Sequence, residues 1–315
     1  MIVISCDSSS DQMQKFLTKP AKHLLGFALF CGIFALVEWR ALVGTFALSL
    51  SNDEYTHILL ILPISVALIF LEWRSLRITV SLSAGIGSAL LVAAVLIACS
   101  TLGVSARLSS DVQLSISMFA LVLSWIGAFV FCFGYRAARS VGFPLCFLFG
   151  LVPFPQFVLN VVVGFLQLCS AWIAHMLFAV FNVPVAQDGV VLVIPGLALQ
   201  VAQECSSIRS SSMLLVTTMV LAQLLLRSPW RRAIVIGLAI PLSVAKNGLR
   251  IFTIAMLGTR VDPEYLTGKL HRQGGIVFFG IALIVVFALF WIFRRGEDSP
   301  FNGQPIPMRV KTTGG

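Results

Sequence analysis

The sequence predicts an all-α polytopic integral membrane protein with about eight transmembrane helices, a short re-entrant element and a small β-hairpin on the outer face. Its composition is the first reason. Of the 315 residues, 58% are hydrophobic and only 11% are charged, and the mean hydropathy is +0.97. A soluble domain carries about 25% charged residues, so this chain could not cover a solvated surface.

The apolar residues are grouped in runs that approach the ~20 residues needed for a helix to cross a bilayer. Eight such runs cover residues 24–38, 57–72, 79–100, 112–134, 157–181, 206–226, 233–257 and 274–293. Residues 141–155 are also apolar, but the stretch is short and contains Pro153 and Pro155 near its end. We therefore expect a re-entrant or half-length element there, buried against the other helices.

Between the fifth and sixth runs, Asp188-Gly189 separates two segments rich in β-branched residues, which predicts a β-hairpin. No internal repeat divides the apolar region, so residues 24–295 are expected to form one transmembrane domain. Residues 1–23 are expected to be a cytoplasmic N-terminal segment. Residues 296–315 are expected to be a disordered cytoplasmic tail.

The positions of the basic residues predict which ends of the spans face the cytoplasm. With the N-terminus in the cytoplasm, 14 of the 22 Lys and Arg residues fall on the inner side, as the positive-inside rule favours. These 14 are Lys15, Lys19, Lys22, Arg74, Arg77, Arg136, Arg139, Arg227, Arg231, Arg232, Arg294, Arg295, Arg309 and Lys311. The sequence thus predicts a multi-pass protein of the plasma (inner) membrane with the β-hairpin outside. The net charge of +9 is scattered between apolar blocks, so nucleic acid is not an expected partner.

The seven cysteines have no repeated spacing, so we expect no disulfide framework, no metal site and no cofactor. Cys205 differs from the others because it lies among polar residues, in QECSSIRSS, where the sixth run begins. A helix N-terminus and Arg209, one turn further on, favour a thiolate here, whereas Glu204 opposes it. The alternative is an inert cysteine beside an ordinary helix cap.

Cys205, Arg250 and His271 are expected at one depth on three successive spans. They are separated by 22, 18 and 23 residues from the inner-face arginines at the other ends of these spans. At about 1.5 Å per residue, these separations correspond to ~33, ~27 and ~35 Å. The hydrocarbon core is about 30 Å thick, so all three residues reach its outer boundary.

Lys246 and Arg250 lie one helical turn apart within an apolar run, with Asn247 between them. Like charges at this spacing repel, so they need a carboxylate, an oxyanion or water nearby. An anion-stabilising role is one interpretation. The alternatives are a structural ion pair with Glu204 or Asp262, and extension of Arg250 to the outer headgroups.

His271, in GKLHRQGG, has the chemistry of a general base for a thiol. Taken alone, it would instead be an interfacial residue that binds headgroups. His57, in SNDEYTHILL, also lies near the expected outer face. It supports the same site, or it belongs to ordinary capping chemistry at a helix start.

Several segments resemble the exosortase/archaeosortase family of polytopic membrane cysteine transpeptidases. They are DEYTHILLILPIS, FLFGLVPFP and, above all, ECSSIRSS followed by AKNGLRI and HRQGG. The resemblance covers about residues 24–295. It implies that Cys205 is the nucleophile, that Arg250 stabilises the oxyanion or positions the substrate, and that His271 transfers protons at an outer-face site. The family more commonly has Cys-Ser-Gly where this chain has Cys-Ser-Ser.

The resemblance also implies the substrates: exported proteins with a C-terminal recognition motif of PEP-CTERM type, a transmembrane helix and a basic cytoplasmic end. Lys246 or Arg209 would engage an acidic residue of that motif, and membrane lipids are further partners. Two other functions remain open. One is a transporter that uses Lys246, Arg250 and His271 as an anion or proton path, and the other is a membrane transferase acting on a lipid-linked substrate.

Overall fold

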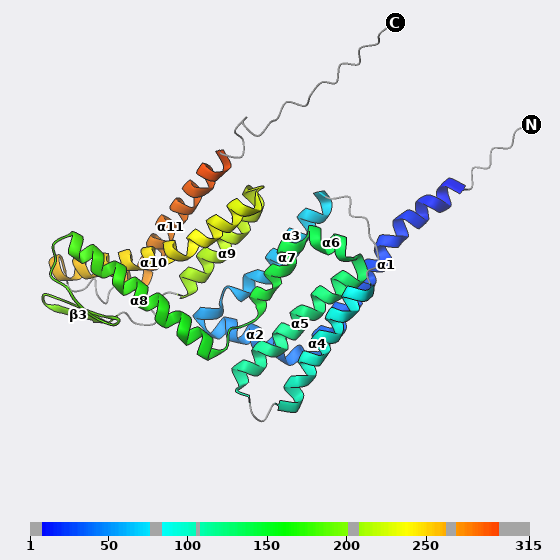
Figure 1. Ribbon diagram of the computed structural model, residues 1–315, viewed down its shortest axis with the longest axis horizontal. Coiled ribbons are helices and arrows are strands. Elements are labelled where there is room, and N and C mark those ends of the chain that lie inside the picture. Colours follow the sequence, from blue (N-terminus) through cyan, green and yellow to red (C-terminus); the bar gives the residue numbers. More distant parts are fainter. Residues whose placement is uncertain (1–7, 76–83, 105–107, 201–207, 263–268, 296–315) are drawn as a thin grey trace, which may run out of the picture. The chain divides into compact units, whose positions relative to one another are not determined.

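The computed structural model describes residues 8–75, 84–104, 108–200, 208–262 and 269–295 (Figure 1). Within these ranges, only the backbone is described for residues 8–22, 73–75, 84, 102–104 and 269–274. The helices are α1 Ser8–Val37, α2 Trp39–Ser51, η1 Asp53–Tyr55, α3 Ile58–Ser75, α4 Ala84–Val104, α5 Ser110–Phe133, α6 Tyr135–Ser140, α7 Gly142–Phe147, η2 Leu148–Leu151, α8 Gln156–Val180, α9 Ile208–Leu225, α10 Pro229–Arg260 and α11 Lys269–Arg295. The strands are β1 Ala186–Asp188, β2 Val191–Ile194 and β3 Leu197–Gln200.

Within the described residues, each of the eight apolar runs overlaps a helix. Six segments of the described chain are long and apolar enough to cross a membrane: Asp53–Glu72, Ser110–Phe133, Gln156–Val180, Ile208–Leu225, Pro229–Arg260 and Gly275–Arg295. The pair His23–Val37 and Trp39–Ser51, bent by 77°, makes a seventh if it is one span. The remaining run corresponds to α4, where Gly85–Thr101 counts as a shorter apolar helix. The all-α polytopic membrane class is therefore confirmed, with six or seven spans by this measure.

Large apolar side chains point away from the protein along these helices. The exposed fraction is 58% for Phe70 in α3, 71% for Val161 in α8 and 76% for Ile276 in α11. In water, a continuous surface of this kind would promote association. In a bilayer the lipid chains cover it.

The chain divides into two compact units, Met1–Gly164 and Phe165–Gly315. In the first unit α4 and α5 lie side by side (Figure 1) because glycines let their backbones approach closely. A Cβ atom on Gly87 would lie 2.6 Å from the backbone of Phe131. A Cβ atom on Gly127 would lie 3.1 Å from the Leu90 side chain.

The apolar stretch 141–155 forms a short helical element in place of a full span. α7 continues into η2, and together they make an apolar helix from Gly142 to Leu151. A helix of this length rises ~15 Å, about half the thickness of the hydrocarbon core. The half-length element predicted from the two prolines is thus present.

Three hydrogen bonds hold the segment that joins this element to α8. Tyr55 Oη donates to Phe154 O at 2.9 Å, and Ser115 Oγ donates to Pro153 O at 2.7 Å. At the start of α8, Gln156 N donates to a side-chain oxygen of Asp111 at 2.8 Å, which satisfies one of the N–H groups that a helix leaves unpaired. The segments DEYTH and LVPFP, far apart in the sequence, therefore meet in the first unit.

The second unit contains a three-stranded antiparallel sheet where the sequence predicted a single hairpin. Asp188 pairs with Val191, so the turn at Gly189 lies where it was expected, with φ +56° at the glycine. A second turn, Pro195-Gly196, adds β3, and Gly196 takes φ +83° as a type II turn requires. The Pro-Gly pair was the missed signal for this extra strand.

Candidate active site

Two arginines join α9, α10 and α11 at the ends that the sequence predicts to lie on the inner side. Arg231 Nη1, at the start of α10, donates to Phe293 O near the end of α11 at 2.6 Å. Arg232 Nε donates to Leu226 O, just after α9, at 2.8 Å. The end of α9, the start of α10 and the end of α11 therefore lie together. This is the common starting level assumed when the depths of Cys205, Arg250 and His271 were counted from the sequence.

A polar layer crosses the interface between the first turn of α9 and the middle of α10. Lys246 is only 6% exposed, and its ammonium group donates to Ser210 Oγ in the first turn of α9. One turn earlier on α10, Ser243 Oγ donates to Ser211 Oγ at 2.7 Å. Arg250 follows Lys246 by one turn and is partly buried. The first turn of α9 is therefore packed against the part of α10 that carries both cations.

Asn247 extends the polar layer to α8. It is 1% exposed, and its Nδ2 donates to Ser170 Oγ at 3.0 Å. Its Oδ1 has no hydrogen-bond partner among the described residues. The helices approach closely here, since a Cβ atom on Gly248 would lie 2.6 Å from the Ile173 side chain. A buried unsatisfied acceptor costs free energy, and exceptions of this kind are often functional.

The sheet packs beside Arg250. Leu192 and Ile194 of β2 lie in one hydrophobic cluster with Phe178 of α8 and with Ile251, the residue after Arg250. The rings of Phe178 and Phe252 meet edge to face, with centroids 5.0 Å apart. The sheet therefore packs near the part of α10 that carries Arg250, and β3 ends five residues before Cys205 in the sequence.

The site residues expected from the sequence differ in how far the structure describes them. Lys246, Asn247 and Arg250 lie together on α10, and Arg209 lies next to Ser210 in the first turn of α9 with an exposed side chain. Cys205 and Glu204 lie outside the described residues. His271 belongs to the first turn of α11, where only the backbone is described.

His57 belongs to the first unit. It follows η1, and its Nδ1 lies 3.2 Å from Glu54 O, a bond in which the ring donates to the carbonyl. Asn52 Oδ1 accepts from Glu54 N at 3.0 Å, so the acidic loop carries capping contacts. This corresponds to the alternative that the sequence left open for His57, and its support of the site stays a prediction.

The sequence reasoning missed the serines of the polar layer. Ser170 and Ser243 were read as parts of apolar runs, and Ser210 and Ser211 only as part of a motif. The available signal was the presence of serine hydroxyls within three apolar runs. The part of the chain that the structure describes contains no group of three His, Cys, Asp or Glu side chains that could bind a metal ion.

The comparison with protein-family models matches residues 49–288 to Transmembrane exosortase (Exosortase_EpsH). This is well over half of the chain. The chain belongs to the transmembrane exosortase family. No match was found among curated proteins or solved structures.

Membership in the exosortase family suggests a membrane peptidase or transpeptidase that acts on the sorting signals of exported proteins. The matched range contains the polar layer and the positions of Cys205, Arg250 and His271. It begins near the end of α2, so the bend between α1 and α2 lies before it. The family match and the apolar helices together establish a multi-pass membrane protein.

Proposed function

We propose that this exosortase is a cysteine protease/transpeptidase that cleaves PEP-CTERM-type sorting signals of exported proteins at the outer face of the plasma membrane. In this proposal Cys205 is the nucleophile, Arg250 stabilises the oxyanion and His271 transfers protons. The observation that carries it is the bond from Lys246 to Ser210, because it holds the helix that follows Cys205 against the turn of α10 that precedes Arg250. Cys205 precedes Ser210 by five residues.

The chemistry follows from these groups. The Cys205 thiolate attacks the carbonyl carbon of the scissile peptide, and the negative charge moves to the carbonyl oxygen. Arg250 offers hydrogen-bond donors to this oxyanion, and its partly buried position strengthens the interaction because the local dielectric is low. The C–N bond then breaks, His271 gives a proton to the leaving amine, and a thioester remains on Cys205.

The second half of the reaction releases the thioester. An amine or water attacks the thioester carbonyl, His271 removes the proton of the attacking group, and the Cys205 thiolate leaves. Lys246, held by Ser210, supplies positive charge to an acidic residue of the recognition motif, and Arg209 supplies it from α9. Asn247 positions this part of α10 through Ser170.

The test is processing of an exported protein that carries a recognition motif, a transmembrane helix and a basic end, expressed together with the exosortase. Cys205→Ala and Cys205→Ser should abolish processing at unchanged enzyme levels. The matched control is Cys146→Ala, because Cys146 is an exposed cysteine of α7 in the first unit. Normal processing by Cys205→Ala would remove the nucleophile assignment.

A second measurement separates the protease from a transporter or a lipid-linked transferase. A thiol-reactive peptide with the sequence of the recognition motif should label the wild-type protein and Cys146→Ala, but not Cys205→Ala. Labelling that is equal in all three proteins would contradict covalent catalysis by Cys205.

A further inference from the structure

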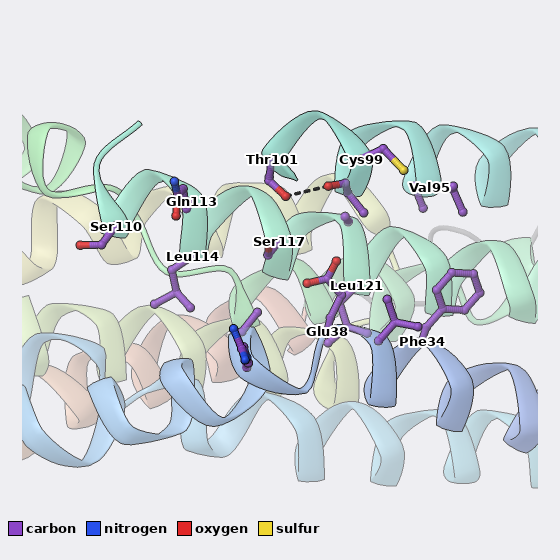
Figure 2. Close-up of a pocket in the computed structure, with 16 residues that line it drawn as sticks. Phe34, Glu38, Val95, Cys99, Thr101, Ser110, Gln113, Leu114, Ser117 and Leu121 are labelled. Carbon is purple, nitrogen blue, oxygen red and sulfur yellow. Dashed lines mark hydrogen bonds between the residues drawn. The ribbon is translucent and has the colours of Figure 1, made fainter. Parts of the chain in front are cut away.

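The first unit contains a cavity that the proposed reaction does not use. Its volume is about 750 Å³, in the range of small-molecule sites, and it lies among the end of α1, the start of α2, α4 and α5 (Figure 2). Its walls are mostly apolar, with Phe34, Val95, Leu114 and Leu121 among the lining residues. These walls suit a hydrocarbon chain.

The polar groups of the cavity include two charges of opposite sign. Glu38 lies at the break between α1 and α2, Arg40 follows two residues later, and both line the cavity. The Ser117 side chain hydrogen-bonds the Glu38 carboxylate from α5. Figure 2 shows this carboxylate directed into the space between its own helix and the helices of Ser117 and Cys99. The cavity lining therefore includes an anionic and a cationic group among mostly apolar side chains.

The residues beside the bend are of kinds that favour the lipid headgroup region. Trp39 is 53% exposed, and the Arg40 guanidinium carbon lies 5.9 Å from the centre of its ring. Exposed tryptophan and arginine side chains are typical of the membrane interface. The 77° bend turns the chain away from the direction of α1 at this point.

We propose that this cavity binds one aminophospholipid of the surrounding bilayer. Its ammonium group donates to the Glu38 carboxylate, its phosphate accepts from the Arg40 guanidinium, and part of one acyl chain lies along the apolar walls. The pair of opposite charges favours a headgroup that carries both a phosphate and an ammonium group with N–H donors. A headgroup without a cation gives the Glu38 carboxylate no charged partner, and a trimethylammonium group has no N–H donors for it. Glu38 and Arg40 precede the range matched by the family model, and the site does not depend on the proposed reaction.

The wild-type protein provides the first test. The full chain is purified in mild detergent, stripped of lipid and mixed with equal amounts of phosphatidylethanolamine, phosphatidylcholine and phosphatidylglycerol with identical chains. Native mass spectrometry then counts the bound molecules. We expect phosphatidylethanolamine to be retained about fivefold over each of the other two, a ratio worth about 1 kcal/mol. Equal retention of the three lipids would overturn the proposal.

The second test changes the carboxylate. Glu38→Gln should lose one bound phosphatidylethanolamine and its preference for this lipid, whereas Glu54→Gln, a carboxylate of η1 outside the cavity, should keep both. Ala98→Phe should lower retention by filling the apolar part of the cavity. Undiminished preference in Glu38→Gln would overturn the proposal. So would complete displacement by soluble phosphoethanolamine, because it would mean that no acyl chain is needed.

Discussion

Lys246 donates a hydrogen bond to Ser210 Oγ across the interface of α10 and α9, at a position where the lysine is 6% exposed. A buried ammonium group is costly in a membrane protein and is usually functional. The serine satisfies one of its three donors. The next turn of α10 carries Arg250, so the two cations raise the positive potential beside the first turn of α9. Whether Lys246 binds an acidic residue of the substrate can therefore be tested by substitution.

Lys246→Met keeps the volume of the side chain and removes its charge. If Lys246 binds an acidic residue of the substrate, processing should fall about 10- to 100-fold, the factor that a charge-assisted hydrogen bond of about 1.5–3 kcal/mol supplies. The thermal stability of the purified protein should stay equal or rise, because replacing a buried ionic group by an apolar one is often stabilising. Processing assays with substrates that have or lack the acidic residue measure the effect.

The control for this variant is Arg260→Met, since Arg260 is an exposed cation at the end of the same helix. It should leave processing and stability unchanged. An equal loss for both substrates in Lys246→Met would contradict recognition of the acidic residue by this lysine.

Arg250→Lys distinguishes oxyanion stabilisation from extension to lipid headgroups. Lysine keeps the charge and reaches headgroups as well as arginine does, but it lacks the planar fork of donors. We expect kcat to fall about 10²- to 10³-fold, as when an oxyanion donor is removed. Single-turnover kinetics with a purified substrate are the measurement. Wild-type rates in this variant would favour the structural role.

Gly248 and Gly237 form a matched pair on α10. A Cβ atom on Gly248 would lie 2.6 Å from Ile173, whereas nothing lies within 4 Å of one on Gly237. Gly248→Ala should therefore lower the stability by about 1–3 kcal/mol through overpacking. Gly237→Ala should raise it by up to about 1 kcal/mol, because alanine favours the helix. Thermal unfolding in detergent measures both, and equal shifts would contradict close packing of α8 and α10.

Ser170→Ala tests the contact that joins α8 to α10. It leaves the Asn247 amide without its serine partner, and bonds of this kind between membrane helices are worth about 0.6–1.7 kcal/mol. The control is Ser124→Ala, because buried Ser124 donates only to Leu121 O of its own helix. Thermal unfolding should separate the two variants, and an equal small loss would mean that the Asn247 contact contributes nothing specific.

The spans could be predicted from the sequence because lipid and protein core both require apolar residues at these positions. Because both environments are apolar, hydropathy does not predict which face of each helix packs against a neighbouring helix and which faces lipid. The contacts of Ser170 with Asn247 and of Ser210 with Lys246 depend on that rotation, so they appear only in three dimensions. The 77° bend was missed because Glu38 was read as the end of a span.

Of the two turns of the sheet, one could be predicted from the sequence and the other was missed. Asp188-Gly189 was recognised between two β-branched runs, whereas Pro195-Gly196 was not read as a turn because it interrupts a short apolar segment. The packing of β2 on α8 and α10 is non-local and has no sequence signal of its own. Among the site residues, spacing alone predicted the placement of Lys246, Asn247 and Arg250 on one helix.

Residue 188 provides a test of the predicted orientation. Asp188 is an exposed residue of β1, and Ser228 lies between α9 and α10, at the end where Arg232 contacts Leu226. In a variant without native cysteines, Asp188→Cys should react with a membrane-impermeant maleimide in intact cells with a permeable outer layer. Ser228→Cys should react only after the plasma membrane is opened. The reverse pattern would place the sheet and the adjacent Arg250 in the cytoplasm, where exported substrates would not meet the proposed site after export.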